Sequence, residues 1–89
     1  MKFSLIAVFG ALVFAAGFAQ ASADCPAYPK SEWMKQADAK AKLLKEGYTI
    51  KVFKVSGNCY ELYGHDKAGK RVEIYFDAKT MAVIKAEDD

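Results

Sequence analysis

The chain opens with one long apolar run, followed by shorter helical and β-type hydrophobic patterns. Residues 3–19 are almost entirely apolar, and Lys2 is the only charged residue before Asp24. Small residues with A-x-A spacing come next. A short positive end, an apolar stretch and small residues are typical of a cleavable secretory signal. We therefore predict a signal peptide over residues 1–23 and a mature domain over residues 24–89.

Two other uses of the apolar run have to be weighed, a retained membrane anchor and a lipid anchor on Cys25. The run is near the lower limit for spanning about 30 Å of hydrocarbon, and no cluster of charges follows it at once. Lipidation needs a small residue just before the cysteine, whereas Asp24 precedes Cys25. Both observations favour cleavage, which predicts a periplasmic or secreted protein with no membrane attachment after the signal is removed.

After the signal, the apolar residues adopt a helical spacing. Pro26 and Pro29 predict an extended arm, and Ser31 is a suitable N-cap. Gly47 is the residue expected just past a helix C-terminus. The pattern thus predicts one amphipathic helix over residues 31–46. Its expected apolar face consists of Trp33, Met34, Ala37, Ala41 and Leu44.

Beyond the helix, the pattern is that of β-strands rich in β-branched and aromatic residues. The expected strands cover residues 48–55, 60–63, 72–76 and, more weakly, 82–86. Three-residue loops at 56–58 and 67–69 join consecutive strands, and Gly69 suits a left-handed position. The predicted fold class is α+β, with one amphipathic helix packed on a three- to four-stranded antiparallel meander sheet in a single domain.

The two loops also predict which side chains share a face of the sheet. The second loop pairs Leu62 with Ile74, and the first pairs Val55 with Cys59. The outward face then carries a group of apolar and aromatic residues, namely Phe53, Val55, Tyr63 and Tyr75. Such a surface often marks an interface, so these four form the predicted partner surface. Two alternatives remain open: a second layer covers this face, or a one-residue slip turns Phe53 and Val55 into the core.

Charge and length narrow the class of protein. The chain has 13 Lys and Arg against 11 Asp and Glu, and Lys2 belongs to the signal. The mature domain is therefore almost neutral, without the strong basic excess of a nucleic-acid-binding protein. About 66 residues form one domain with a modest core, which often needs a covalent staple.

The two cysteines, Cys25 and Cys59, supply that staple. Export places them in an oxidising compartment, where one intramolecular disulfide is expected. It would close a loop of about 35 residues. The alternative, a redox-active pair, would require C-x-x-C spacing.

Candidate chemistry is sparse. With both thiols paired, no thiol is left to act with His65, the only histidine, and Ser31 and Ser56 are explained as a helix cap and a loop residue. His65 and Asp66 offer two metal ligands where a site needs three or four. Glu61 and Glu73 are each expected opposite a tyrosine on an exposed face, as solubilising cross-strand pairs rather than an acid–base pair. We predict a non-enzymatic protein with no catalytic residues, no metal and no cofactor.

Three segments then resemble a known family. They are Gly47-Tyr48-Thr49-Ile50, the run from Gly57 to Gly64 that reads GNCYELYG, and the run from Val72 to Asp77 that reads VEIYFD. Together they resemble PepSY domains of the small stand-alone type in bacterial exported proteins, over residues 25–84. One departure is Met81, which stands where the family's last hairpin usually has glycine, so that turn is expected to be strained or differently built.

The resemblance implies a function and a compartment. PepSY domains are similar to the pro-segments of secreted metallopeptidases, and the family is proposed to restrain peptidases outside the cytoplasm. It implies a periplasmic or secreted, protein-binding module whose partner is another protein, such as a peptidase or a membrane protein. Two alternatives are a small-molecule or metal-sensing domain that uses His65 and Asp66, and a structural accessory of a membrane complex.

Overall fold

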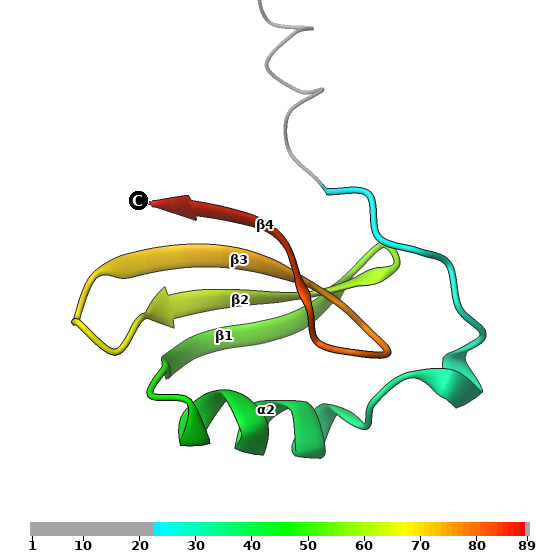
Figure 1. The fold of residues 1–89 in the computed structure, drawn as a ribbon, viewed down its shortest axis with the longest axis horizontal. Helices are drawn as coiled ribbons and strands as arrows, with labels where there is room; N and C mark the ends of the chain where they lie inside the picture. Colours follow the sequence, from blue (N-terminus) through cyan, green and yellow to red (C-terminus); the bar gives the residue numbers. More distant parts are fainter. Residues whose placement is uncertain (1–22, 89) are drawn as a thin grey trace, which may run out of the picture.

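The computed structural model describes residues 23–88, so the predicted signal peptide, apart from Ala23, lies outside the described residues. The elements are η1 (Lys30–Glu32), α2 (Gln36–Lys45), β1 (Thr49–Ser56), β2 (Cys59–His65), β3 (Arg71–Asp77) and β4 (Val83–Asp88). The four strands form an antiparallel sheet in the order β1-β2-β3-β4. Figure 1 shows this meander with α2 on one side. The predicted α+β class is confirmed. No helix within the described part is long and apolar enough to cross a membrane.

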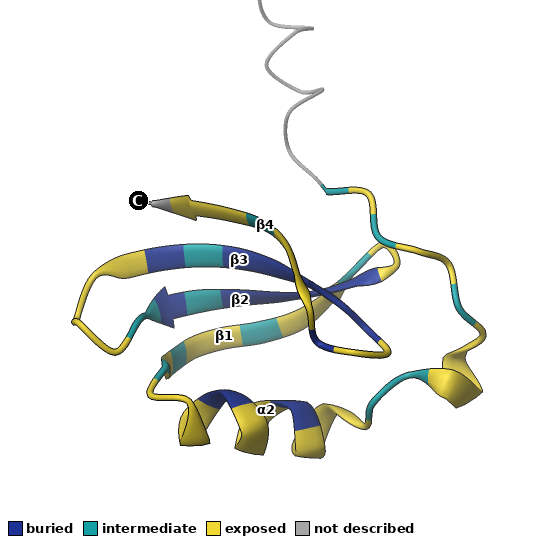
Figure 2. Cartoon of the chain, in the orientation of Figure 1, coloured by how far each residue is buried: buried dark blue, intermediate teal, exposed yellow. Residues whose placement is uncertain are grey.

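The core lies between α2 and one face of the sheet. Ala39 and Leu43 are the buried residues of α2 (Figure 2). They belong to a cluster with Tyr60, Leu62, Val72, Ile74, Phe76, Ala78 and Met81. Trp33, Met34, Tyr48, Ile50 and Phe53 pack against this cluster from its edges. One helix over four strands therefore forms a single thin core.

The predicted helix start and helix face are wrong. The α-helix begins only at Gln36, and Ser31 lies in the short 3-10 turn η1. Trp33 and Met34 precede α2, so helical spacing does not relate them to it. When only the residues of α2 are considered, the buried apolar face of the helix consists of Ala39 and Leu43. Three residues of the predicted face are exposed instead, namely Ala37, Ala41 and Leu44.

The β2–β3 hairpin follows the predicted register, with Tyr60 opposite Phe76 and Leu62 opposite Ile74. The Asp66 carboxylate oxygen Oδ1 accepts hydrogen bonds from the backbone N–H groups of Ala68 and Lys70, each at 2.9 Å. Gly69 has a φ of 87°, the left-handed conformation that its place in the loop predicted. Local turn chemistry therefore determines this register.

The β1–β2 register differs from the prediction by one residue. Ser56 pairs with Cys59, so the hairpin loop contains two residues, and Gly57 adopts a φ of 60°. Phe53 then lies opposite Leu62 and packs on the core face, with its ring centroid 5.0 Å from that of Tyr60. Val55 pairs with Tyr60 and turns to the same side, where it is exposed. The placement of Phe53 and Val55 on the outward face is therefore wrong.

A β-bulge between Ile50 and Val52 interrupts the start of β1. Gly64 on β2 lies beside it, and a Cβ atom there would come within 1.9 Å of the Thr49 carbonyl oxygen. Only a glycine allows the β1 backbone to approach this closely. The bulge leaves Lys51 as an extra residue, which changes the direction in which its side chain leaves the strand.

The turn before β4 confirms that Met81 is an unusual residue for its backbone position. Met81 has a φ of 63°, where glycine is normally favoured. Its side chain is buried in the core cluster, which compensates for the backbone conformation. Asp77 Oδ1 accepts hydrogen bonds from the backbone N–H groups of Lys79 and Thr80 and closes the turn.

The predicted disulfide between Cys25 and Cys59 is present, with the two Cα atoms 5.4 Å apart. It ties the N-terminal arm, residues 23–29, to the start of β2. Figure 1 shows this arm, in cyan, passing the end of the sheet with the β1–β2 hairpin before it reaches η1 and α2. The Trp33 indole N–H donates a hydrogen bond to the Tyr28 carbonyl oxygen at 3.0 Å and holds the far end of the arm.

Candidate functional site

The sheet face opposite α2, called the open face below, carries the polar and aromatic side chains of β2 and β3. The register places on it Glu61, Tyr63 and His65 from β2, and Arg71, Glu73 and Tyr75 from β3. Val52 and Lys54 of β1 pair with Tyr63 and Glu61 and share this side. On this face Glu61 and Tyr75 are buried, whereas Val52 and Arg71 are exposed, so the open face contains both a buried and an accessible half.

Two carboxyl groups and two tyrosines form a cluster on this face, in which Glu61 and Tyr75 are buried and Glu73 and Tyr63 are half-buried. Glu61 lies opposite Tyr75 and Tyr63 lies opposite Glu73, as the sequence predicted. The Tyr75 hydroxyl donates a hydrogen bond to Glu73 Oε2 at 3.0 Å. The prediction of exposure is wrong, because Glu61 and Tyr75 are each only 3% exposed. Glu61 and Tyr75 are therefore packed against neighbouring side chains and do not serve to make the face soluble.

Burial of Glu61 and the hydrogen bond between Glu61 and Glu73 shift the pKa values of the two carboxyl groups in opposite directions. It raises the pKa of Glu61 above its ordinary value of 4.5, and the hydrogen bond with Glu73 raises it further. The same hydrogen bond lowers the pKa of Glu73. When the pair shares one proton, Glu61 therefore carries it. The hydrogen bond to Glu73 raises the pKa of Tyr63, and burial raises that of Tyr75, so both phenols remain protonated donors.

This arrangement is suited to structure rather than to acid–base catalysis. A general acid must reach the reacting group of a substrate within hydrogen-bond distance. The Glu61 carboxyl is buried, and its neighbours are Glu73 and the two tyrosines. Its exposed neighbour Lys54 lies 4.0 Å away, a weak ion pair at most. The cluster is a hydrogen-bonded network whose most buried members are Glu61 and Tyr75.

Replacing Glu61 with glutamine should increase the stability of the domain relative to wild type as the pH rises from about 4 to about 7. The raised folded pKa means that the unfolded state releases its proton first. Wild-type stability therefore falls as the pH rises from 4.5 through the folded pKa of Glu61. Glutamine carries no titrating proton, and its amide can still donate to Glu73. Urea denaturation at both pH values measures the difference.

The matched control is Glu73→Gln, for which the opposite trend is expected. The lowered pKa of Glu73 means that its carboxylate stabilises the fold at neutral pH, and this contribution is lost as the pH falls through the folded pKa. The control variant should therefore lose most stability at pH 7. A Glu61→Gln difference from wild type that does not grow between the two pH values would contradict the assignment.

The four residues of the predicted partner surface do not lie together. Phe53 and Val55 belong to the helix side, as described above. Tyr75 shares the open face with Tyr63, but it is buried, and Tyr63 is half-buried. Of the four, only Tyr63 offers surface on the open face. Its neighbour there is Val52, an exposed apolar residue that the shifted register brings opposite it.

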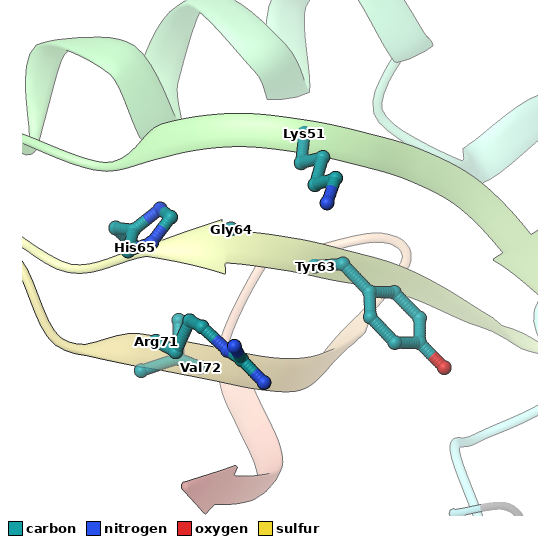
Figure 3. Close-up of a pocket in the computed structure, with 6 residues that line it drawn as sticks. All are labelled: Lys51, Tyr63, Gly64, His65, Arg71 and Val72. Carbon is teal, nitrogen blue, oxygen red and sulfur yellow. The ribbon is translucent and has the colours of Figure 1, made fainter. Parts of the chain in front are cut away.

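The accessible half of the open face contains a hollow of about 200 Å³, lined by Lys51, Tyr63, Gly64, His65, Arg71 and Val72. Figure 3 shows Lys51 and Arg71 on the strands to either side of Gly64, and Tyr63 and His65 on either side of Gly64 along its own strand. The β2–β3 register brings His65 and Arg71 opposite each other in this region. The contribution of Lys51 depends on the bulge, for which the sequence has no clear signal.

A metal site at His65 gains no support from the geometry. The proposed second ligand, Asp66, uses Oδ1 to hold its own turn. The described part of the chain has no group of three or more His, Cys, Asp or Glu side chains that could hold a metal ion.

Comparison with known proteins identifies the fold family. No curated protein and no solved structure matches the chain. Residues 5–87, nearly the whole chain, match the family described as peptidase propeptide and YPEB domain. This agrees with the resemblance read from the segments around Gly47, Gly57 and Val72, and it makes the chain a peptidase-propeptide-like module. The chain belongs to the PepSY domain family.

Proposed function

We propose that the protein is an exported, non-enzymatic binding module that restrains an extracytoplasmic peptidase, which it contacts through the accessible half of its open face. The observation that carries the proposal is the uncovered sheet surface where Val52 and Tyr63 lie opposite each other. Exposed apolar and aromatic surface on an otherwise polar face favours a protein partner. Family membership supports a peptidase as the class of partner.

Export agrees with the covalent structure. The apolar N-terminal run has the features of a secretory signal. A disulfide such as Cys25–Cys59 persists in oxidising compartments and is rare in the cytoplasm. We propose cleavage after residue 23 and release of residues 24–89. Expression of the full chain in a bacterial host, followed by mass measurement of the periplasmic product, tests this step. A product that retains Lys2 would contradict it.

Capture and inhibition together test the binding function. The periplasmic product is immobilised and exposed to periplasmic extract of the organism that encodes the chain. Bound peptidases are identified by mass spectrometry, and the hydrolysis of casein by each is measured with and without the domain. The proposal expects one peptidase to be retained and slowed. Retention of no peptidase, or retention without slowing, would overturn it.

Two matched surface variants show which face is used. Val52→Glu places a charge on the open face, whereas Leu44→Glu places one on the solvent side of α2, and both residues are exposed in the free domain. Burying an unpaired carboxylate at an interface is costly. We therefore expect Val52→Glu to weaken peptidase binding at least tenfold and Leu44→Glu to leave it unchanged. The reverse order would assign binding to the helix.

A further inference from the structure

The hollow on the open face combines a lysine and an arginine side chain with the hydrogen-bonding ring of a histidine. The Lys51 ammonium comes from the bulge of β1, and the Arg71 guanidinium comes from β3. His65 pairs with Arg71 across the hairpin, and its ring can donate a further hydrogen bond. Figure 3 shows these side chains arranged around the backbone of Gly64, which forms the floor.

The described residues supply no counterion for the basic side chains of the hollow. Among the described residues, no hydrogen bond or ion pair engages the side-chain ends of Lys51, His65 or Arg71. Glu73 is the nearest carboxylate along β3, but it accepts a hydrogen bond from the Tyr75 hydroxyl. Two cations without a partner around a concave surface are complementary to an anion from outside the domain.

We propose that this hollow binds a carboxylate group of the partner polypeptide, either an Asp or Glu side chain or the C-terminal carboxylate. An arginine guanidinium offers two parallel N–H donors that match the two oxygens of a carboxylate, and Lys51 adds a third donor from the opposite side. Tyr63 lines the hollow and Val52 lies opposite Tyr63 on β1, so an apolar residue beside the carboxylate completes the contact. This inference rests on the proposed function, because it assigns the polar anchor of the same surface.

Short peptides test the hollow without the natural partner. The 15N-labelled periplasmic product is titrated with four probes: acetyl-Gly-Phe-Asp-Gly-amide, its Asn counterpart, acetyl-Gly-Phe-Gly with a free carboxyl end, and inorganic phosphate. We expect at least one carboxylate peptide to shift the amide signals of Tyr63, His65 and Arg71. The Asn peptide and phosphate should shift them at least tenfold less at equal concentration. The first and third probes distinguish a side-chain from a terminal carboxylate.

Charge variants locate the contact. Arg71→Gln should weaken binding of the carboxylate peptide about tenfold, as expected for loss of one exposed charged hydrogen-bonding pair. Lys40→Gln, which removes the same charge from the exposed side of α2, should leave it unchanged. Equal shifts from the Asp and Asn peptides, preference for phosphate, or equal loss in both variants would each overturn the proposal. If Arg71→Gln does not change peptidase capture, the proposed role of the hollow is wrong but the proposed function is not affected. If no peptidase is captured at all, the proposed function is wrong.

Discussion

Replacing Cys25 and Cys59 with serine is expected to lower the free energy of unfolding by about 4 kcal/mol. The disulfide spans a sequence separation of 34 residues, and closing a loop of that length removes about this much entropic stabilisation from the unfolded chain. A domain of this size with one thin core has only about 3–5 kcal/mol from its core. The variant should therefore be close to its unfolding midpoint at 37 °C, as circular dichroism and Trp33 fluorescence in urea will show.

A second double variant separates the effect of losing the covalent bond from the effect of the side chains that replace the cysteines. Cys59 is fully buried, so serine there also buries a hydroxyl, whereas alanine does not. The double alanine variant controls for this effect and should lose nearly as much stability. Adding reductant should destabilise wild type alone. A loss below about 1 kcal/mol in both double variants would mean that the arm is held by its other contacts, such as the Trp33–Tyr28 hydrogen bond.

The hairpin between β2 and β3 was predictable because its turn is chemically specific. Asp66 can accept hydrogen bonds from the backbone that follows it, and Gly69 can adopt a positive φ. Both act within five residues of sequence. Once the turn is set, the pairing of Leu62 with Ile74 follows by counting.

The first strand could not be assigned in the same way. Ile50 and Val52 have one parity, and Phe53 and Val55 have the other, so alternation supports either face. The structure uses both parities. Phe53 and Val55 lie on the helix side, and the bulge allows Ile50 to pack there as well while Val52 turns outward. A bulge that depends on the fit of Thr49 against Gly64 is a tertiary feature.

The same limit explains the candidate site. Pairing of Glu61 and Glu73 with tyrosines followed from the β2–β3 register, but the register does not reveal that Glu61 is buried and Glu73 half-buried. Lys51 joins the hollow only through the bulge. Short-range patterns thus located the open face, and long-range packing decided which of its residues are accessible.

The start of α2 also depends on distant residues. The Met34 backbone N–H donates to the Ala78 carbonyl oxygen at 2.9 Å, and the Tyr60 hydroxyl donates to the Met34 carbonyl oxygen at 2.6 Å. These bonds hold Met34 in an extended segment and so delay the helix until Gln36. The sequence around Ser31 is compatible with an N-cap, and it gives no sign of the hydrogen bonds that join Met34 to the distant residues Ala78 and Tyr60.

Truncating Leu43 to alanine is expected to lower the free energy of unfolding by about 3 kcal/mol, whereas Leu44→Ala should change it by less than about 0.5 kcal/mol. The two leucines are adjacent and chemically identical, so helix propensity changes equally in both variants. They differ in burial, because Leu43 is 1% exposed and Leu44 is 57% exposed. Urea denaturation followed by circular dichroism measures both losses, and the sequence-based helix face predicts the reverse order.

The pair also tests whether α2 supports the function through packing alone. If Leu43 anchors the helix against Leu62 and Phe76, its truncation should loosen the core while the disulfide still links the arm to β2. Peptide binding at the hollow should then persist in the folded fraction of Leu43→Ala, because Lys51, His65 and Arg71 lie on the opposite side of the sheet. A loss of peptide binding greater than the folded fraction explains would show that helix packing sets the twist of β1, and with it the bulge that presents Lys51.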